Sequence, residues 1–386
     1  MAQRRIPAVY MRGGTSKGVF FHAYDLPADP SQRDAILLRV VGSPDAYEKH
    51  IDGMGGATSS TSKVVLISKS SRGDCDVDYL YGGVSIEKPV VDWSGNCGNL
   101  TAAVGPFAIS EKLVEAPING TAMVRIWQAN LGQRIVAHVE MRDGEVVEDG
   151  TFELDGVAFP GSEIELEFLN PTGDAGKMLP TGAPVDRLEV PGVGLIDATL
   201  INAGNPTIFV RAEALGLSGI EMQVDVNGDS DLLARAEAIR AHAAVKMGLA
   251  SSAEEATTAR PHTPKLAYVS PPAEYTASNG KVVSTGQIDI VARIFSMGLL
   301  HHAMTGTGAV AIAAAGSVPG TVVSTLLGDT RVRKVRFGHP SGTLTVGAEV
   351  ANKVDTWTVS KVTMSRSARR LMDGHVYVPQ VSSGNS

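Results

Sequence analysis

The sequence predicts an α/β protein of two similar domains, and three observations support this fold class. The chain has 386 residues, which is longer than one hydrophobic core usually serves. A glycine-flanked turn that leads into a helix of small residues occurs at 93–104 and again at 304–313. A glycine-rich turn followed by an apolar strand precedes each of them, at 14–26 and 204–215. Two matched pairs in the same order indicate duplication and fusion of one α/β unit.

Short strands dominate the first half of the chain. Apolar runs separated by turn residues predict strands at 63–68, 76–80, 123–128, 135–141 and 161–168. Asp143-Gly144 follows an alternating apolar segment and predicts a tight hairpin. Proline and glycine concentrate at 170–194, so we expect domains at 1–184 and 185–386. We leave open that a C-terminal strand near 372–380 returns to the first domain.

The second half combines strands with two predicted helices. Apolar positions at 230–247 fall on one helical face, and Asp229 or Ser230 can cap the start of this helix. A further helix is expected at 287–302, directly before the second glycine turn. Strands are expected at 196–210, 332–337, 342–350 and 356–363.

Composition excludes several classes of protein. With 43% hydrophobic and 19% charged residues, the chain is expected to fold rather than to be disordered. Its net charge of -7 argues against nucleic acid or an anionic membrane as a partner. Neither a membrane-spanning run nor a signal peptide is apparent, so we expect a cytoplasmic protein in which Cys75 and Cys97 stay reduced.

Cys97 is the first candidate functional residue, because it lies in the turn Gly95-Asn96-Cys97-Gly98-Asn99 at a predicted helix start. Backbone N–H groups at such a start lower a thiol's pKa and bind anions such as carboxylates. The alternative is a buried cysteine that packs as a small hydrophobic residue. The glycine and asparagine neighbours favour the reactive thiol.

Lys63 is the second candidate, since it stands where a polar loop becomes an apolar strand. Burial, or a nearby cation such as Arg12 or Lys17, would lower its pKa toward that of a general base. The alternative is a strand-end lysine whose ammonium group reaches water. The preceding glycines do not form a phosphate loop, because the order G-x-x-x-x-G-K-[ST] is absent.

A metal hydrolase is disfavoured, and no metal site is expected. The adjacent His301 and His302 would point to different sides of the predicted helix, which makes them a poor chelating pair, and no H-E-x-x-H motif occurs.

Six motifs spread over the whole chain together resemble the PrpF family. They lie at 11–21, 55–63, 94–99, 202–206, 305–309 and 365–379. The resemblance implies the diaminopimelate-epimerase-like fold: two pseudo-symmetric α/β domains, each a β-sheet wrapped around a central helix, with the active site in the cleft between them. It also implies isomerisation of unsaturated di- or tricarboxylic acids without a cofactor.

The resemblance assigns the catalytic roles to Lys63 and Cys97. Related epimerases carry a second cysteine where this chain has Thr305. Because a threonine hydroxyl cannot readily act as the second base, amino-acid racemisation is disfavoured. The expected substrate-binding residues, some of which could instead cap a helix or hold a turn, are Arg12, Ser16, Lys17, Asn96, Gly98, Asn99, Asn205, Thr305, Gly306 and Thr307.

The expected reaction is allylic proton transfer. Cis/trans isomerisation of 2-methylaconitate in propionate catabolism is the first expectation, and methylitaconate isomerisation or 4-oxalomesaconate tautomerisation are the alternatives. A different class is a noncatalytic partner that stabilises an aconitase-like enzyme. The expected partner is the small-molecule polycarboxylate; functional pairing with an aconitase-like dehydratase and a homodimer are left open.

Overall fold

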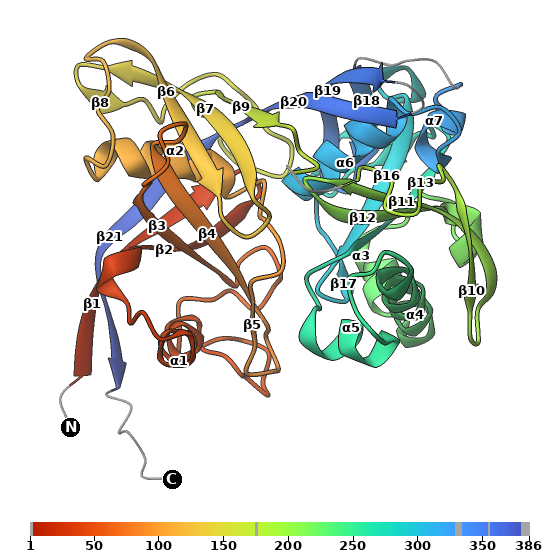
Figure 1. The fold of residues 1–386 in the computed structure, drawn as a ribbon, viewed down its shortest axis with the longest axis horizontal. Helices are drawn as coiled ribbons and strands as arrows, with labels where there is room; N and C mark the ends of the chain where they lie inside the picture. Colours follow the sequence, from red (N-terminus) through yellow and green to blue (C-terminus); the bar gives the residue numbers. More distant parts are fainter. Residues whose placement is uncertain (1–2, 174–176, 329–333, 354–355, 380–386) are drawn as a thin grey trace.

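The chain folds into two lobes that stand side by side, each with strands packed around one apolar helix (Figure 1). The computed structural model describes residues 3–173, 177–328, 334–353 and 356–379. The central helices are α2 (Thr101–Ser110) and α6 (Gly306–Gly316). Nearly every residue of both helices is buried, as expected for helices that are apolar on all sides.

The remaining elements follow in chain order. The first lobe contains β1 (Gln3–Gly13), β2 (Ser16–His22), η1 (Ala23–Asp25), α1 (Pro30–Val41), β3 (Lys63–Lys69), β4 (Val77–Val84), β5 (Val91–Asp92), β6 (Gly120–Gln128), β7 (Gln133–Arg142), β8 (Glu145–Val146) and β9 (Ile164–Leu169). The second contains β10 (Asp186–Val190), β11 (Gly194–Ala203), β12 (Asn205–Arg211), η2 (Ala212–Leu215), α3 (Gln223–Asn227), α4 (Ser230–Lys246), α5 (Ala253–Ala259), β13 (Lys265–Ser270), β14 (Tyr275–Thr276), β15 (Val282–Val283), η3 (Thr285–Gln287), β16 (Ile290–Ser296), β17 (Leu299–Leu300), α7 (Val322–Leu326), β18 (Lys334–His339) and β19 (Gly342–Lys353).

The two lobes repeat one order of strand pairings. In the first, β1–β2 is antiparallel, β2–β3 parallel, β3–β4 antiparallel, β4–β6 parallel and β6–β7 antiparallel. In the second, β11–β12, β12–β13, β13–β16, β16–β18 and β18–β19 follow the same sequence of directions. This is the repetition that duplication of one α/β unit predicts.

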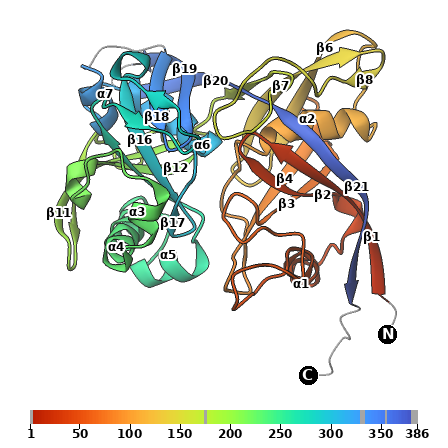
Figure 2. The same ribbon diagram turned by 180° about the vertical axis from the view of Figure 1, so that it is seen from behind.

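Two long C-terminal strands connect the lobes. β20 (Thr356–Arg366) pairs with β19 on one side and with β9 of the first lobe on the other. β21 (Ala368–Pro379) then runs antiparallel to β1, as the red and blue strands of Figure 2 show. The division into domains at residue 184 itself stays a prediction.

Most predicted strands and the first predicted helix are present. Asp143 and Gly144 both adopt positive φ and join β7 to β8 in a two-residue hairpin. Asp229 caps α4, because its carboxylate accepts a hydrogen bond from the N–H of Leu232. The predicted strand 196–210 turns back at Gly204, which has a φ of 74°, and residues 332–333 of another predicted strand lie outside the described residues.

The helix predicted at 287–302 is wrong. This segment forms β16 and β17. All seven residues of β16 are buried, the polar Arg293 and Ser296 included, so the strand is a mostly apolar run that lacks alternation. Such a run cannot be distinguished from a buried helix by periodicity, and the β-branched Ile290, Val291 and Ile294 were the signal for a strand.

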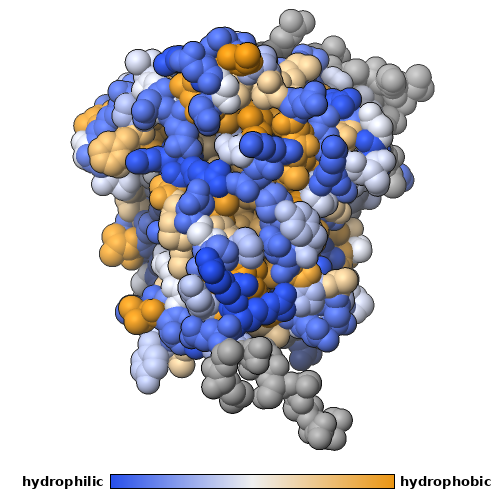
Figure 3. Space-filling view, turned by 90° about the vertical axis from the view of Figure 1, so that its left-hand side faces the viewer, coloured by the Kyte–Doolittle hydropathy of each residue, from blue (hydrophilic) through white to orange (hydrophobic). Residues whose placement is uncertain are grey.

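The surface on the side of the first lobe mixes hydrophobic with hydrophilic side chains (Figure 3), which is ordinary for a folded chain. Within the described ranges, each helix is too short or too polar to cross a membrane.

Candidate active site

The starts of the two central helices carry equivalent side chains. The Sγ of Cys97 accepts a hydrogen bond from the N–H of Leu100, three residues on, at 3.5 Å. The Oγ1 of Thr305 accepts from the N–H of Gly308, also three residues on, at 3.1 Å. Thr305 is therefore the geometric counterpart of Cys97, and its hydroxyl acts as a helix cap.

Glycine allows the two helix starts to touch. A Cβ on Gly98 would lie 2.7 Å from the backbone N of Thr307, and one on Gly306 would lie 2.5 Å from the carbonyl carbon of Gly98. Both contacts are shorter than any side chain tolerates, so only glycine permits this approach. The N–H groups of Gly306 and Thr307 belong to the first helical turn, which lacks intrahelical acceptors and carries partial positive charge.

Lys63 is the first residue of β3 and is 5% exposed. Its Nζ donates to the hydroxyl of Tyr81 at 2.9 Å. Burial lowers the pKa of the Lys63 ammonium group, whereas negative charge on the nearby Cys97 sulfur opposes this shift. The alternative of a strand-end lysine reaching water does not fit this position.

Lys265 occupies the matching place in the second lobe, and sequence reasoning missed it. It is the first residue of β13, the counterpart of β3, and is 2% exposed. Its Nζ donates to Ser296 Oγ at 2.9 Å. Burial and the nearby Lys63 lower the pKa of Lys265 to about 7. A signal was available, because both lysines open a run of apolar residues after a polar loop.

His262 and Tyr81 lie between the two lysines. The Nε2 of His262 is 3.3 Å from the carbonyl oxygen of Asn96, so Nε2 carries the proton and donates. Its Nδ1 is then the acceptor for Lys265, at 3.2 Å. The rings of Tyr81 and His262 are in contact, with centroids 5.1 Å apart. The two amines thus belong to one buried polar cluster.

Three of the expected substrate-binding asparagines hold the lobes together. The N–H of Asn96 donates to Asn205 Oδ1 at 2.8 Å, and Asn205 Nδ2 donates back to the Asn96 carbonyl at 2.9 Å. Asn99 Nδ2 donates to Thr15 Oγ1 at 3.0 Å and to the Met304 carbonyl at 3.2 Å. Of the side-chain donors of these three asparagines, the Nδ2 of Asn96 is the one that is buried without a partner in the described residues, so a ligand could still use it.

Arg12, Ser16 and Lys17 line a pocket of about 580 Å³ beside this centre. The Nη1 of Arg12 donates to the backbone carbonyls of Gly14 and Ser367, at 3.0 and 2.9 Å. Lys17 Nζ lies over the ring of Tyr10, 5.5 Å from its centroid. The pocket is also lined by His302 of the second lobe and connects to the centre through Thr15.

The histidine pair is not placed as predicted. His301 and His302 follow β17, outside any helix, and their rings stack with centroids 4.6 Å apart. Burial lowers the pKa of His301 well below its usual value. The argument from opposite sides of a helix is therefore wrong.

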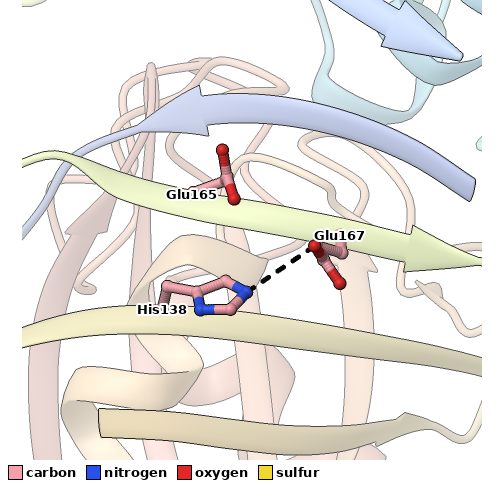
Figure 4. A group of neighbouring side chains, drawn as sticks. All are labelled: His138, Glu165 and Glu167. Atoms are coloured by element: carbon pink, nitrogen blue, oxygen red, sulfur yellow. Dashed lines mark ion pairs between the residues drawn. The ribbon is translucent and has the colours of Figure 1, made fainter. Parts of the chain in front are cut away.

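One group of side chains of the kinds that bind metal ions lies away from this centre. His138 of β7 and Glu165 and Glu167 of β9 cluster on the first-lobe sheet (Figure 4). His138 Nε2 is 3.8 Å from a Glu167 oxygen, and the same carboxylate accepts from Lys361 Nζ at 3.3 Å. The Lys361 ammonium group thus already pairs with one of the two carboxylates.

Comparisons with known proteins agree with this architecture. The chain is 58% identical to the 2-methyl-aconitate isomerase of Shewanella oneidensis, over 98% of both chains. It is 40% identical to the solved structure of methylitaconate-delta-isomerase, with a TM-score of 0.76 and coverage of 100% and 98%. A probable proline racemase from Agrobacterium radiobacter, only 13% identical, aligns with a TM-score of 0.56 over 98% and 94% of the two chains.

The fold is therefore the predicted racemase and epimerase-like one. The PrpF protein family matches residues 3–379, which is almost the whole chain. Because the family matches residues 3–379 and a relative is 58% identical over 98% of both chains, this chain belongs to the PrpF family.

Proposed function

We propose that this chain is a cofactor-independent isomerase of unsaturated di- and tricarboxylic acids, and that 2-methylaconitate is its substrate in cis/trans isomerisation. The single observation that carries the proposal is the buried Lys63 amine within reach of the Cys97 thiol, at the point where two helix starts meet. The names of the relatives support the same reaction and substrate class.

The base in this reaction is the neutral amine of Lys63. It takes a proton from the carbon next to the double bond, and the C–H electron pair moves into the conjugated system as a dienolate-like anion. Rotation about the former double bond followed by return of a proton gives the other geometric isomer. Cys97 or the Lys63 ammonium group supplies that proton, so no net charge or electron is gained or lost.

Two features lower the barrier for this step. The first turns of α2 and α6 present N–H groups where negative charge develops on a carboxylate or carbonyl oxygen. Lys265 places a second buried amine near Lys63, and two such amines cannot both stay protonated without a large electrostatic cost. The pair therefore gives up one of its two protons near pH 7, and in this proposal the reactive neutral amine is Lys63, the one beside Cys97.

Thr305 has no proton-transfer role in this scheme. Its hydroxyl accepts from the Gly308 N–H as a helix cap, and its pKa is far too high for a base. The site then has its acid–base groups, Lys63 and Cys97, on the first lobe and a binding surface on the second. This asymmetry favours an allylic isomerase over a two-thiol racemase.

The decisive experiment follows proton exchange by NMR in deuterated buffer. Purified protein is incubated separately with 2-methylaconitate, trans-aconitate, methylitaconate and 4-oxalomesaconate. We expect isomerisation of 2-methylaconitate with deuterium at the acidic carbon, and no exchange with Lys63→Met. Faster turnover of 4-oxalomesaconate or methylitaconate would reassign the substrate. No turnover of any of them would favour the noncatalytic partner of an aconitase-like enzyme.

The biological setting stays a prediction from the sequence. We propose that an aconitase-like dehydratase in propionate catabolism supplies the substrate, that the protein is cytoplasmic, and that it forms a homodimer.

A further inference from the structure

We propose that Arg366 and the start of α2 form a subsite for one carboxylate group of the ligand. Arg366 is the last residue of β20, at the point where the chain crosses between the lobes. The assignment rests on the proposed function, because it names the group that would hold one end of a polycarboxylate substrate.

The Arg366 guanidinium group is buried without a carboxylate partner. The residue is 2% exposed. Its Nε donates to Asn99 Oδ1 at 3.0 Å, and its Nη1 donates to the Ser365 carbonyl at 2.9 Å. Its Nη2 has no hydrogen-bond partner in the described part of the chain, and this atom is not fully enclosed by protein. This nitrogen therefore faces space that a ligand atom can reach.

Other buried arginines in this chain are compensated differently. Arg240, 4% exposed, makes two hydrogen bonds to the Glu237 carboxylate and donates to three backbone carbonyls. Arg293 also has no carboxylate partner in the described residues, but it lies over the ring of Tyr275, donates to three backbone carbonyls, and has an unpaired Nη2 that is fully enclosed. A buried cation without such compensation is costly, and a bound anion would remove that cost.

The surroundings place this cation next to the proposed chemistry. Asn99, which fixes the guanidinium group, follows Cys97 by two residues at the start of α2. Burial lowers the pKa of Arg366 to about 10, and Cys97 is the group whose negative charge opposes the shift. A Cβ on Gly14 would lie 3.1 Å from Arg366 Cδ, so the first glycine turn borders the same space.

A carboxylate at this position would receive two kinds of donor. The free Nη2 of Arg366 supplies a charged hydrogen bond, and the first turn of α2 supplies backbone N–H groups. Charged hydrogen bonds of this kind are worth about 1.5–3 kcal/mol, which corresponds to a roughly 10- to 100-fold change in affinity. Arg366 thus fixes the orientation of the substrate relative to Lys63.

The test measures binding separately from turnover. Tricarballylate has three carboxylates but no double bond, so its Kd by calorimetry does not depend on isomerisation. We expect Arg366→Met to raise this Kd at least 10-fold and Arg366→Lys to raise it less. The control Arg240→Met should lower Tm, since it leaves Glu237 unpaired, but should leave the Kd of tricarballylate unchanged.

A second measurement tests the subsite even if Arg366→Met folds poorly. Wild-type protein should bind tricarballylate more tightly than the dicarboxylate glutarate, and the Lys variant, which keeps a flexible cation, should show less of this preference. Unchanged Kd values in a folded Arg366→Met or Arg366→Lys protein would overturn the subsite, as would a wild-type protein that does not bind tricarballylate. A wild-type protein that binds tricarballylate through Arg366 but isomerises no substrate would refute the proposed function and leave the subsite standing.

Discussion

Replacing Lys265 with methionine should move the pH dependence of catalysis to higher pH. Lys265 is fully buried, and its Nζ is held by Ser296 and His262 in the same cluster as Lys63. When both amines carry a proton their charges repel each other, so the pair releases its first proton at a lower pH than a single buried amine would. Methionine has a similar length and no charge, so the substitution removes this repulsion while filling most of the same volume.

The size of the shift follows from the electrostatics of two buried amines. The pKa of Lys265 falls from 10.5 to about 7, and Lys63 is the second cause after burial. For an illustrative separation of about 7 Å, two unit charges interact by about 2 kcal/mol at an effective dielectric constant of about 20, which equals roughly 1.5 pKa units. We therefore expect the first proton of the pair to leave about one to two pH units higher in Lys265→Met, where Lys63 is the remaining amine.

The assay is kcat/KM for trans-aconitate measured from pH 6 to 10. A base must be neutral to act, so activity rises with pH through its pKa, and a higher pKa moves this acidic limb to higher pH. At pH 7 the variant should lose about 10- to 100-fold in kcat/KM and recover most of it above pH 9. Lys265→Arg carries a permanent charge and should not show this shift to higher pH. A folded Lys265→Met protein with an unshifted limb would refute the coupling.

The same variant changes the pH dependence of stability. Between pH 7 and 10.5 an unfolded chain binds a proton at Lys265 that the folded chain does not bind, so the free energy of unfolding rises with pH across this window. The contribution approaches about 5 kcal/mol at its upper limit, at 1.36 kcal/mol per pKa unit. Chemical denaturation at pH 7 and pH 9 should show this increase in wild type and a smaller one in Lys265→Met.

Three further predictions concern the helix starts and the base. Lys63→Met should abolish turnover while Kd for tricarballylate stays within a few-fold, and Lys63→Arg should not rescue it, because a guanidinium group stays protonated; near-normal kcat in Lys63→Met would end the lysine-base hypothesis. Cys97 should react with iodoacetamide faster than Cys75, whose pKa is raised by burial, and trans-aconitate should protect it; equal rates by mass spectrometry without protection would count against a site at Cys97. Gly306→Ala should cost both activity and roughly 2–4 kcal/mol of stability, since its Cβ would lie 2.5 Å from the backbone of Gly98; wild-type activity and Tm would contradict the close contact.

Pattern reasoning found the elements whose signals are local. Strands with turn residues at both ends, the Asp143-Gly144 hairpin and the Asp229 cap depend on neighbouring residues, so they could be predicted. The segment 287–302 could not be assigned correctly, because a strand buried on both faces lacks alternation. Burial on both faces is a property of the assembled lobe rather than of the segment.

The site shows the same division. The turns around Cys97 and Thr305 could be recognised as a pair, because both have glycines at a predicted helix start, a pattern that is visible in the sequence. The sequence signal for Lys265 is weak, since it is only a lysine before an apolar run. No sequence pattern distinguishes Arg366 from its neighbours Arg369 and Arg370. Their importance lies in burial and in missing charge partners, which are three-dimensional properties.

The sequence by itself determined the duplicated α/β unit, the family motifs and the candidates Lys63 and Cys97, because turns, caps and repeats can be recognised from short stretches of residues. Only the tertiary structure decided that Lys265 stands near Lys63, that the Asn205 side chain bonds to the Asn96 backbone across the lobes, and that Lys17 lies over the ring of Tyr10. Parallel pairing of β2 with β3 and of β12 with β13 brings both lysines to equivalent strand starts, and packing of α2 against α6 at Gly98 and Gly306 sets them around one centre. Electrostatic coupling depends on distance and burial, and neither is fixed until the two halves fold against each other.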